Sequence, residues 1–476
     1  MKVLKKILIA LLLLLTCFFI CCGNNNDKPV TPDPTPVNPD PVDPDPVDPN
    51  PVDPDPVDPD PVNPTPVDKN KTNRYMLEEE ENCFYFFWET QNVNEKLGGC
   101  GLIPDRYPSN GLASIASVGF GLGAFVVGAY KGYVTNEEAK ARVNLTLDHI
   151  KDLDRVNGFF YHFYQEKAGL VASGSEVSNI DTAIFLCGAL LAGQYFGGET
   201  LEKAYAIYDE VDWTWFVNPK TKNFYMSYNS DTKKFGGEWD VYAEHLMMFF
   251  LAAGSRTHPI EKQTYDAMKR NKGTFQGYTC INSWFGSIFT YQFSHAFIDF
   301  RNMVDDKGVN WFENSVNATY ADYAYCQANP DNFVTFGPDQ WGITACDTPT
   351  GYSGLLGTSP SGTGMDKKFS NDGTVAPCGA IGSIVFAPEL VMPCFKNYST
   401  LLNGALVGDY GYYDAFNFEG KKPWIATSVI GIDKGISILM IENFVSEIVW
   451  DTFIQLDFMD VAIERLGFTK TGDNNG

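Results

Sequence analysis

Positive charge and histidine are both scarce in this chain of 476 residues. The 35 Lys and Arg residues face 59 Asp and Glu, so the formal net charge is −24, and only five residues are histidine. A chain this acidic repels nucleic acid and anionic lipid, because no basic patch outweighs the repulsion. We therefore expect no nucleic-acid partner. The few histidines also disfavour a serine or cysteine nucleophile activated by histidine.

Common cofactor motifs are absent as well. The sequence contains no dinucleotide-binding fingerprint, no phosphate-binding loop and no HExxH zinc motif. The eight cysteines that follow the N-terminal region form no CxxC pair, so a zinc site is not expected. The sequence thus predicts neither a cofactor nor a metal. Cys187 lies in an apolar segment and is expected to be a core thiol.

A long apolar run occurs only at the N-terminus. Three lysines within Met1–Lys6 precede the apolar stretch Ile7–Ile20, which is the pattern of a bacterial secretory signal. The run is shorter than the roughly 20 apolar residues that a membrane-spanning helix needs. Cys21 and Cys22, followed by small polar residues, resemble a lipoprotein signal. We predict a signal peptide over 1–22, lipidation at Cys21 or Cys22, and a membrane contact made only through that anchor; ordinary secretion is the alternative.

Basic residues are missing from the next segment too. Pro29–Asp68 holds 16 of the 28 prolines and ten aspartates, with no Lys or Arg. Alternating prolines favour polyproline II and remove backbone donors, so this segment builds no core. At about 3.1 Å per residue it reaches roughly 120 Å when extended. We predict a disordered linker over 23–72 that holds an exported domain away from the cell surface.

The remainder, residues 73–470, is predicted to be one large helical domain. Thr135-Asn-Glu-Glu138 is a capping box that opens a helix reaching about Leu153. Strand patterns are few and short. Further helices are expected at Ser114–Tyr130, Ile180–Phe196, Tyr242–Ala253, Pro259–Lys272, Ile288–Met303, Trp311–Ala328, Ile436–Trp450 and Asp451–Leu466.

This helix count favours a helical toroid, an all-α (α/α)6 barrel whose loops line a funnel at one end. We expect the protein to be a monomer, although no sequence feature bears on its oligomeric state. A solenoid is the alternative, but the domain shows no repeat of 30–45 residues.

Carboxylates set among aromatic residues and glycines are the candidate chemistry. Glu176 and Asp181 lie at the start of an apolar helix, where capping is the structural alternative. Glu244 follows Trp239 and Tyr242 and runs into another apolar helix. A carboxyl packed against aromatics has a raised pKa, which a general acid requires.

Three more clusters add polar and aromatic side chains. His295 and Asp299 are spaced to share one helix face, near Arg301, as either a structural pair or a sugar contact. The second cluster is a loop with Trp341, Asp347 and Tyr352, whose aromatic rings could stack on sugars. The third is a glycine-rich segment with Asp414, Trp424 and Asp433, in which Asp433 either caps a helix or reaches into a cavity. Aromatic faces stack on sugar rings and paired carboxylates cleave glycosidic bonds, so a neutral glucan or oligosaccharide is the expected partner.

In this order, the clusters resemble the bacterial glucoamylase-like family of glycoside hydrolases, which includes endo-β-1,2-glucanases. The resemblance spans about residues 74–468. It rests on the segments Gly158-Phe-Phe-Tyr-His162, Ser175–Ala183, Trp239-Asp-Val-Tyr-Ala-Glu244, Ser294–Arg301, Trp341–Asp347, Tyr410–Asn417 and Gly431-Ile-Asp-Lys-Gly435.

The resemblance implies a single (α/α)6 barrel that hydrolyses a β-glucan with inversion and without a metal. It makes Glu244 the general acid and Asp433 the candidate base, with Glu176 and Asp181 as rival bases or substrate-holding residues. Exo action, another linkage, and a non-catalytic glycan-binding lipoprotein are the alternatives. The expected substrate contacts are Trp239, Tyr242, His295, Arg301, Trp341, Asp347, Tyr352, Asp414 and Trp424.

Overall fold

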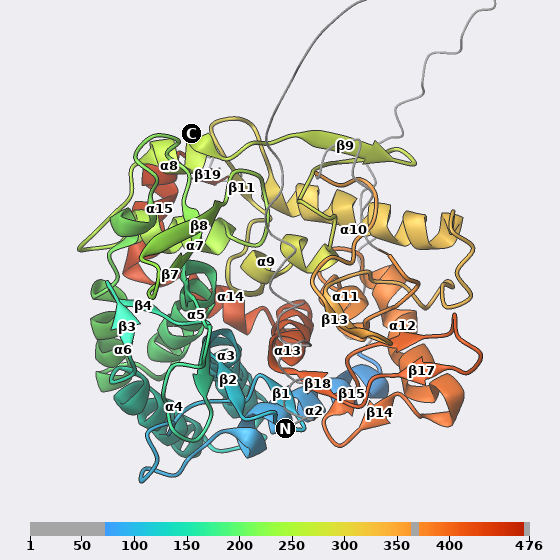
Figure 1. Ribbon diagram of the computed structural model, residues 1–476, viewed down its shortest axis with the longest axis horizontal. Helices are drawn as coiled ribbons and strands as arrows, with labels where there is room; N and C mark the ends of the chain where they lie inside the picture. Colours follow the sequence, from blue (N-terminus) through green and yellow to red (C-terminus); the bar gives the residue numbers. More distant parts are fainter. Residues whose placement is uncertain (1–71, 363–370, 471–476) are drawn as a thin grey trace, which may run out of the picture. The chain divides into compact units, whose positions relative to one another are not determined.

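The computed structural model describes residues 72–362 and 371–470, and these residues are mostly helical (Figure 1). The predicted signal peptide, the lipidation site and nearly all of the predicted linker lie outside the described residues. The helices are α2 (Arg74–Thr90), α3 (Ile115–Lys131), α4 (Asn136–Ile150), α5 (Asn179–Phe196), α6 (Glu199–Asp209), α7 (Leu246–Gly254), α8 (Lys262–Ala267), α9 (Phe293–Phe297), α10 (Trp311–Ala328), α11 (Pro377–Ile381), α12 (Pro388–Thr400), α13 (Gly431–Val445), α14 (Ile448–Phe453) and α15 (Asp457–Leu466), with 3-10 turns η1 (Trp213–Phe216), η2 (Ile288–Tyr291) and η3 (Leu401–Asn403).

Short antiparallel strands join the helices. One sheet has three strands, β6 (Val177–Ser178), β7 (Tyr225–Asn229) and β8 (Lys234–Glu238). The rest are two-stranded: β1 (Arg106–Tyr107) with β18 (Val429–Ile430), β2 (Leu112–Ser114) with β5 (Phe163–Gln165), β3 (Arg155–Val156) with β4 (Phe159–Phe160), β9 (Lys272–Phe275) with β10 (Tyr278–Ile281), β11 (Met303–Val304) with β19 (Thr469–Lys470), β12 (Cys346–Thr348) with β13 (Gly351–Ser353), β14 (Val407–Gly408) with β15 (Gly411–Tyr412), and β16 (Phe416–Asn417) with β17 (Trp424–Ile425).

Helices α3, α5 and α13 form the centre of the core. Most residues of each are buried, and α3 packs against both of the others (Figure 1). Gly119 of α3 and Gly188 of α5 permit the closest crossing, because a Cβ on Gly188 would lie 1.8 Å from the Gly119 carbonyl oxygen. Helices that are apolar on all sides need such burial, which explains why these segments are interior.

Local signals predicted several helices well. The capping box of Thr135 and Glu138 is present, and α3, α5 and α10 begin and end close to the predicted residues. The segment expected to be helical over Ile436–Trp450 starts earlier and breaks between α13 and α14, where Glu447 has φ +65°.

Two predicted helices are much shorter than expected. The segment predicted over Pro259–Lys272 is helical only in α8, because Met268 is extended and β9 follows. The helix predicted over Ile288–Met303 shrinks to η2 and α9, which ends at Phe297. Asp299 is therefore not on a helix with His295.

The structure also shows the state of the cysteines and the length of the apolar helices. All eight cysteines within the described residues are free and buried, Cys187 among them, so its predicted place in the core is confirmed. Within residues 72–362 and 371–470, no helix is both long and apolar enough to cross a membrane.

Candidate active site

Three acidic residues from distant parts of the chain lie where buried helices begin. Asp181 is in the first turn of α5 and Asp433 in the first turn of α13, while Glu244 occupies the turn just before α7. Figure 1 shows these three helices in the interior of the fold. The positive end of a helix dipole favours carboxylates at such positions.

Glu244 is half-buried, and Tyr242, two residues earlier, is buried in the core. The backbone there is fixed by Ser294, whose hydroxyl donates to the Glu244 carbonyl oxygen and accepts the Met247 N–H at 3.0 Å. Burial raises the pKa of Glu244 to about 7, and the negative charge of Asp181 adds to the rise. This carboxyl can hold a proton near neutral pH, as a general acid must.

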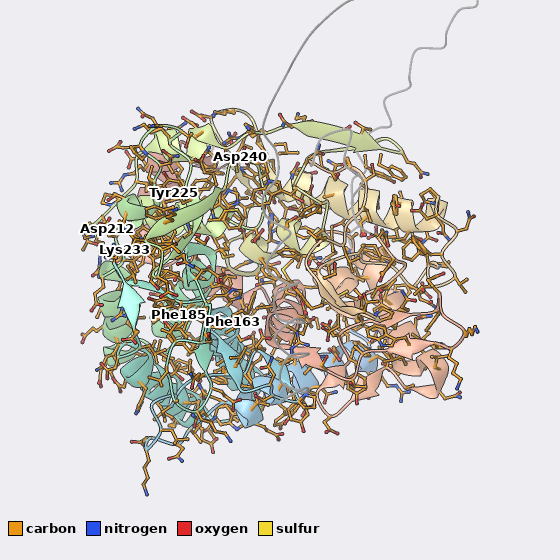
Figure 2. The ribbon with its side chains drawn as sticks, viewed as in Figure 1. Phe163, Phe185, Asp212, Tyr225, Lys233 and Asp240 are labelled. Atoms are coloured by element: carbon orange, nitrogen blue, oxygen red, sulfur yellow. The ribbon has the colours of Figure 1, made fainter. Side chains whose placement is uncertain are left out.

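His162 connects the two acids of the α5 region. Its Nδ1 lies 3.0 Å from Glu176 Oε1 and its Nε2 lies 3.7 Å from Asp181 Oδ1. The ring stacks on Phe163, labelled in Figure 2, with centroids 3.8 Å apart. Although burial lowers the pKa of His162, Asp181 and Glu176 raise it to about 9, so the ring is an imidazolium at neutral pH.

In return, His162 affects Glu176. Burial alone would raise the pKa of the Glu176 carboxyl, but the hydrogen bond and charge of His162 lower it. Sequence reasoning assigned no role to His162. Two features of the sequence could have indicated a role for His162. It is one of only five histidines in the chain, and it ends the segment Gly158-Phe-Phe-Tyr-His162 on which the family resemblance rests.

Asp433 and Asp414 form a second acidic centre. Their residues are 8% and 5% exposed, and burial raises the pKa of Asp433 to about 6 and that of Asp414 well above its usual range. Asp414 Oδ2 accepts the backbone N–H of Asp347 at 2.6 Å, and the Cys378 thiol bonds the Asp433 carboxylate. Asp433 is therefore poised to ionise in mildly acidic solution.

Arg106 holds the outer part of this centre. Its Nη1 lies 3.2 Å from both carboxylate oxygens of Asp347, which also accepts the Ser428 hydroxyl, and its Nε lies 3.5 Å from Asp105. Sequence reasoning missed Arg106 and Asp105, because nothing local distinguishes this loop from a surface turn.

Asp105 links the two centres into one site. Burial raises the pKa of its carboxyl, which interacts with His162 and Asp181 on one side. On the other side its charge raises the pKa of Asp433, and its carbonyl oxygen accepts the Gly431 N–H at 2.8 Å. The acids at α5, α7 and α13 therefore belong to one continuous electrostatic network.

Tyr352 is a solvent-exposed aromatic residue at this site. It lies opposite Asp347 in the β12–β13 hairpin and is 51% exposed. Burial of its hydroxyl raises its pKa well above its usual range, and the charges of Asp433 and Asp414 add to the rise. A ring with one open face beside carboxylates is suited to stack on a sugar.

Some predicted contacts are wrong. Trp341 is 0% exposed and packs against Tyr323, so it is a core residue and not a stacking platform. His295 is fully buried, with Nε2 2.9 Å from the Ser315 hydroxyl, and burial lowers its pKa to about 3. Neither side chain reaches a ligand, because apolar packing encloses both.

Arg301 is also misassigned. It pairs with Asp299 and with Glu447, which lies beyond the C-terminal end of α13. Because α13 begins beside Asp433 and rises about 1.5 Å per residue, Glu447 is about 20 Å from the acidic centre. Arg301 stabilises the opposite end of the fold.

The remaining predicted contacts, Trp239, Tyr242 and Trp424, are buried or half-buried. Trp239 is buried and donates its Nε1–H to Asn179 at 3.1 Å, while Tyr242 stacks on Trp311 with centroids 4.7 Å apart. Both support the residues above them and have no free face for a sugar. Trp424 is half-buried on β17, opposite Asn417. Within the part of the chain that the structure describes, no group of acidic, histidine or cysteine side chains is arranged to hold a metal.

Comparison with known protein families tests the resemblance predicted from the sequence. Residues 237–457 match the family model Glycoamylase, described as "Putative glucoamylase". The resemblance to the glucoamylase-like family is confirmed. The glucoamylase-like match includes Glu244, Asp414 and Asp433, whereas His162 and Asp181 precede it.

The chain is also similar in sequence to a curated glucan hydrolase. An exo-β-1,2-glucooligosaccharide sophorohydrolase of Parabacteroides distasonis is 24% identical over 435 residues, covering 82% of this chain and 57% of that protein. This chain thus spans just over half the length of that curated relative.

Solved structures show the fold. An endo-β-1,2-glucanase from Chitinophaga pinensis, in complex with sophorotriose and glucose, matches with a TM-score of 0.75 and 23% identity, covering 85% of this chain and 99% of that chain. A β-1,2-glucanase from Parabacteroides distasonis matches with a TM-score of 0.74 and 22% identity over 84% of this chain and 60% of that chain. This chain therefore has the mostly helical fold of these glucanases.

Proposed function

We propose that this protein is a glycoside hydrolase that cleaves β-1,2-glucan with inversion. The observation that carries the proposal is one network holding a proton-bearing carboxyl, Glu244, and a second buried carboxyl, Asp433, at the starts of two different interior helices. The named relatives act on β-1,2-linked glucans, which supports this linkage.

The proposal includes the finer architecture. The helices would alternate between outer and inner layers of an (α/α)6 barrel, with α3, α5, α7, α9, α11 and α13 inside. The beginnings of these inner helices would then surround one funnel. The positions of Asp181, Glu244 and Asp433 before or within first turns support this arrangement.

In the proposed mechanism, Glu244 protonates the glycosidic oxygen as the bond breaks. Asp433, ionised, removes a proton from water that attacks the anomeric carbon from the opposite face. Tyr352 stacks on a sugar ring, and the His162 imidazolium holds Glu176 and Asp181 as acceptors for sugar hydroxyls. Endo cleavage is the mode we propose, with exo release of short oligosaccharides as the alternative.

The proposal is tested by incubating the purified protein with linear β-1,2-glucan and separating the products. Wild type is expected to release oligosaccharides whose new reducing end first appears as the α-anomer by proton NMR. Glu244→Gln should lose roughly 10²–10⁴-fold in rate, the usual contribution of a general acid. Glu464→Gln, an exposed acid of α15, is the control and should match wild type.

Other outcomes would reject parts of the proposal. Equal rates for Glu244→Gln and wild type would remove Glu244 from the mechanism. An initial β-anomer would establish retention. Product patterns separate endo cleavage, which gives a ladder of lengths, from exo cleavage, which gives a single short product. Binding without any release would favour a non-catalytic glycan-binding role.

We also propose that the protein is exported and anchored by a lipid on Cys21 or Cys22. The apolar run ending at these cysteines supports this. Mass spectrometry of the mature N-terminus would show a diacylated or triacylated cysteine; an unmodified mature chain would indicate ordinary secretion.

A further inference from the structure

Asp414 and Asp433 present an unusual pair of buried oxygens. Both residues are more than nine-tenths buried and line one small cavity. Asp414 Oδ1 and Asp433 Oδ2 receive no hydrogen bond from a donor among the described residues. Each acid is nevertheless within hydrogen-bonding reach of the other.

The nearby cations are engaged elsewhere. The amino group of Lys434, which lines the same cavity, lies 2.7 Å from Glu79 Oε1. The Arg106 guanidinium is held by Asp347 and Asp105. Two adjacent buried carboxylates that are not bonded to a cation cannot both ionise at modest cost, so the pair must share a proton.

The surroundings decide which acid carries this proton. Asp433 lies in the first turn of α13, where the helix dipole favours a negative charge, and the Cys378 thiol bonds its carboxylate. Asp414 Oδ2 is occupied by the Asp347 N–H, which leaves Oδ1 to bear the proton. The other titratable or charged groups facing the pair are Glu79 of α2, Asp105 and Arg106 near β1, Cys346 and Asp347 of β12, Tyr352 of β13, Tyr412 of β15 and Lys434 of α13.

We propose that Asp414 is a protonated positioning residue whose Oδ1–H donates to the Asp433 carboxylate and aims its other oxygen at the attacking water. This inference rests on the proposed function only where it calls Asp433 the base. Asp414 keeps its own proton throughout, and the proton taken from water resides on Asp433 before it leaves to solvent. Asp414 was predicted to bind substrate, but its burial assigns it to this supporting position instead.

The kinetic test compares two variants of Asp414. Asp414→Asn keeps an N–H donor toward Asp433, so it should retain most of kcat and the wild-type acidic limb of the pH profile. Asp414→Ala removes the donor, so kcat should fall roughly 10- to 100-fold and the acidic limb should move to higher pH by about one pH unit. KM should stay near wild type in both, because Asp414 does not touch the sugar.

A second measurement is independent of activity. When the protein unfolds at pH 7 in weak buffer, wild type should release about one proton more than Asp414→Asn, because Asp414 returns to its ordinary pKa. The buried acids elsewhere contribute equally to both proteins, so the difference isolates this pair.

The outcomes separate the two claims. Equal proton release by wild type and Asp414→Asn would overturn the protonated pair. Equal loss of activity and equal limbs in Asp414→Asn and Asp414→Ala would overturn the positioning role. If wild type cleaves no glucan, the proposed function fails, while the proton count still decides whether Asp414 is protonated.

Discussion

At the scale of single residues, Glu244 and Asp433 set the expected pH dependence of the reaction. Burial raises the pKa of Glu244 to about 7 and that of Asp433 to about 6. The acid must be protonated and the base ionised in the active form. Activity should therefore rise as pH increases through about 6 and fall as it increases through about 7.

The profile of kcat/KM against pH measures these two limbs in the free enzyme. We expect a narrow bell whose maximum lies between the two values. Glu244→Gln should lose the alkaline limb from its residual activity, whereas Glu464→Gln should keep the whole bell. A profile that is flat between pH 5 and 8 would contradict the assignment of both groups.

His162 carries the second prediction at this scale. Its neighbours Glu176 and Asp181 raise its pKa to about 9. His162→Gln removes the positive charge between them, and we expect kcat/KM to fall roughly tenfold or more because two substrate-holding carboxylates lose their orientation. His149→Gln, a half-buried histidine of α4, is the matched control.

Proton NMR measures the cause directly. The His162 ring should titrate near pH 9, and Glu176→Gln should lower that value. A ring that titrates at or below 6.5 would show that the acids do not hold an imidazolium.

At the scale of elements, one buried ion pair joins α2 to α13. Lys434 Nζ lies 2.7 Å from Glu79 Oε1, and both side chains are almost completely buried. Glu79 Oε2 also accepts the Tyr412 N–H at 2.9 Å, so β15 is fixed to the same place. The pair secures the start of α13, and with it Asp433.

We expect Lys434→Met to lower the free energy of unfolding by about 3–5 kcal/mol, because it leaves the Glu79 carboxylate buried without its cation. The double variant Glu79→Gln/Lys434→Met should recover most of that loss, since no buried charge remains. Denaturant unfolding measures both. If the double variant is no more stable than the single one, the ion pair is not the reason for the loss.

At the scale of the whole molecule, buried carboxyls should make the fold sensitive to alkali. Burial raises the pKa of Asp322 to about 7 and that of Glu80, beside Glu442 and Lys131, to about 8. A folded-state pKa above the unfolded value means that the native state binds the proton more tightly. The stabilisation is complete below about pH 4 and is lost as pH rises through 7 to 8.

The midpoint temperature of unfolding should therefore fall between pH 6.5 and 9, with His162 adding to the loss near pH 9. Glu80→Gln should make this decline less steep, because it removes a pH-dependent loss in the free energy of unfolding on the order of a few kcal/mol at pH 9. Burial lowers the pKa values of His245 and His295 to about 3. The stability that these neutral rings contribute to the fold is lost only as pH falls below about 6.5. A midpoint that rises from pH 6.5 to 9 would contradict this account.

The sequence by itself determined the helices whose signals are local. The caps and apolar patterns of α3, α4, α5 and α10 predicted their bounds closely, because a cap or a buried face is encoded within one or two turns. Glu244 and Asp433 were recognisable for the same reason, as acids placed at the start of apolar segments.

Only the tertiary structure decided which side chains meet. His162 joins Glu176 and Asp181 across a loop, and the charge of Asp105 links them to Asp433, more than 300 residues further along the chain. No local pattern encodes these meetings. Packing likewise buried Trp341 and His295, although both stand in segments that suggest a binding loop. Burial depends on all the neighbours a residue acquires, so the exposure and the pKa of a side chain follow from the fold and not from the sequence around it.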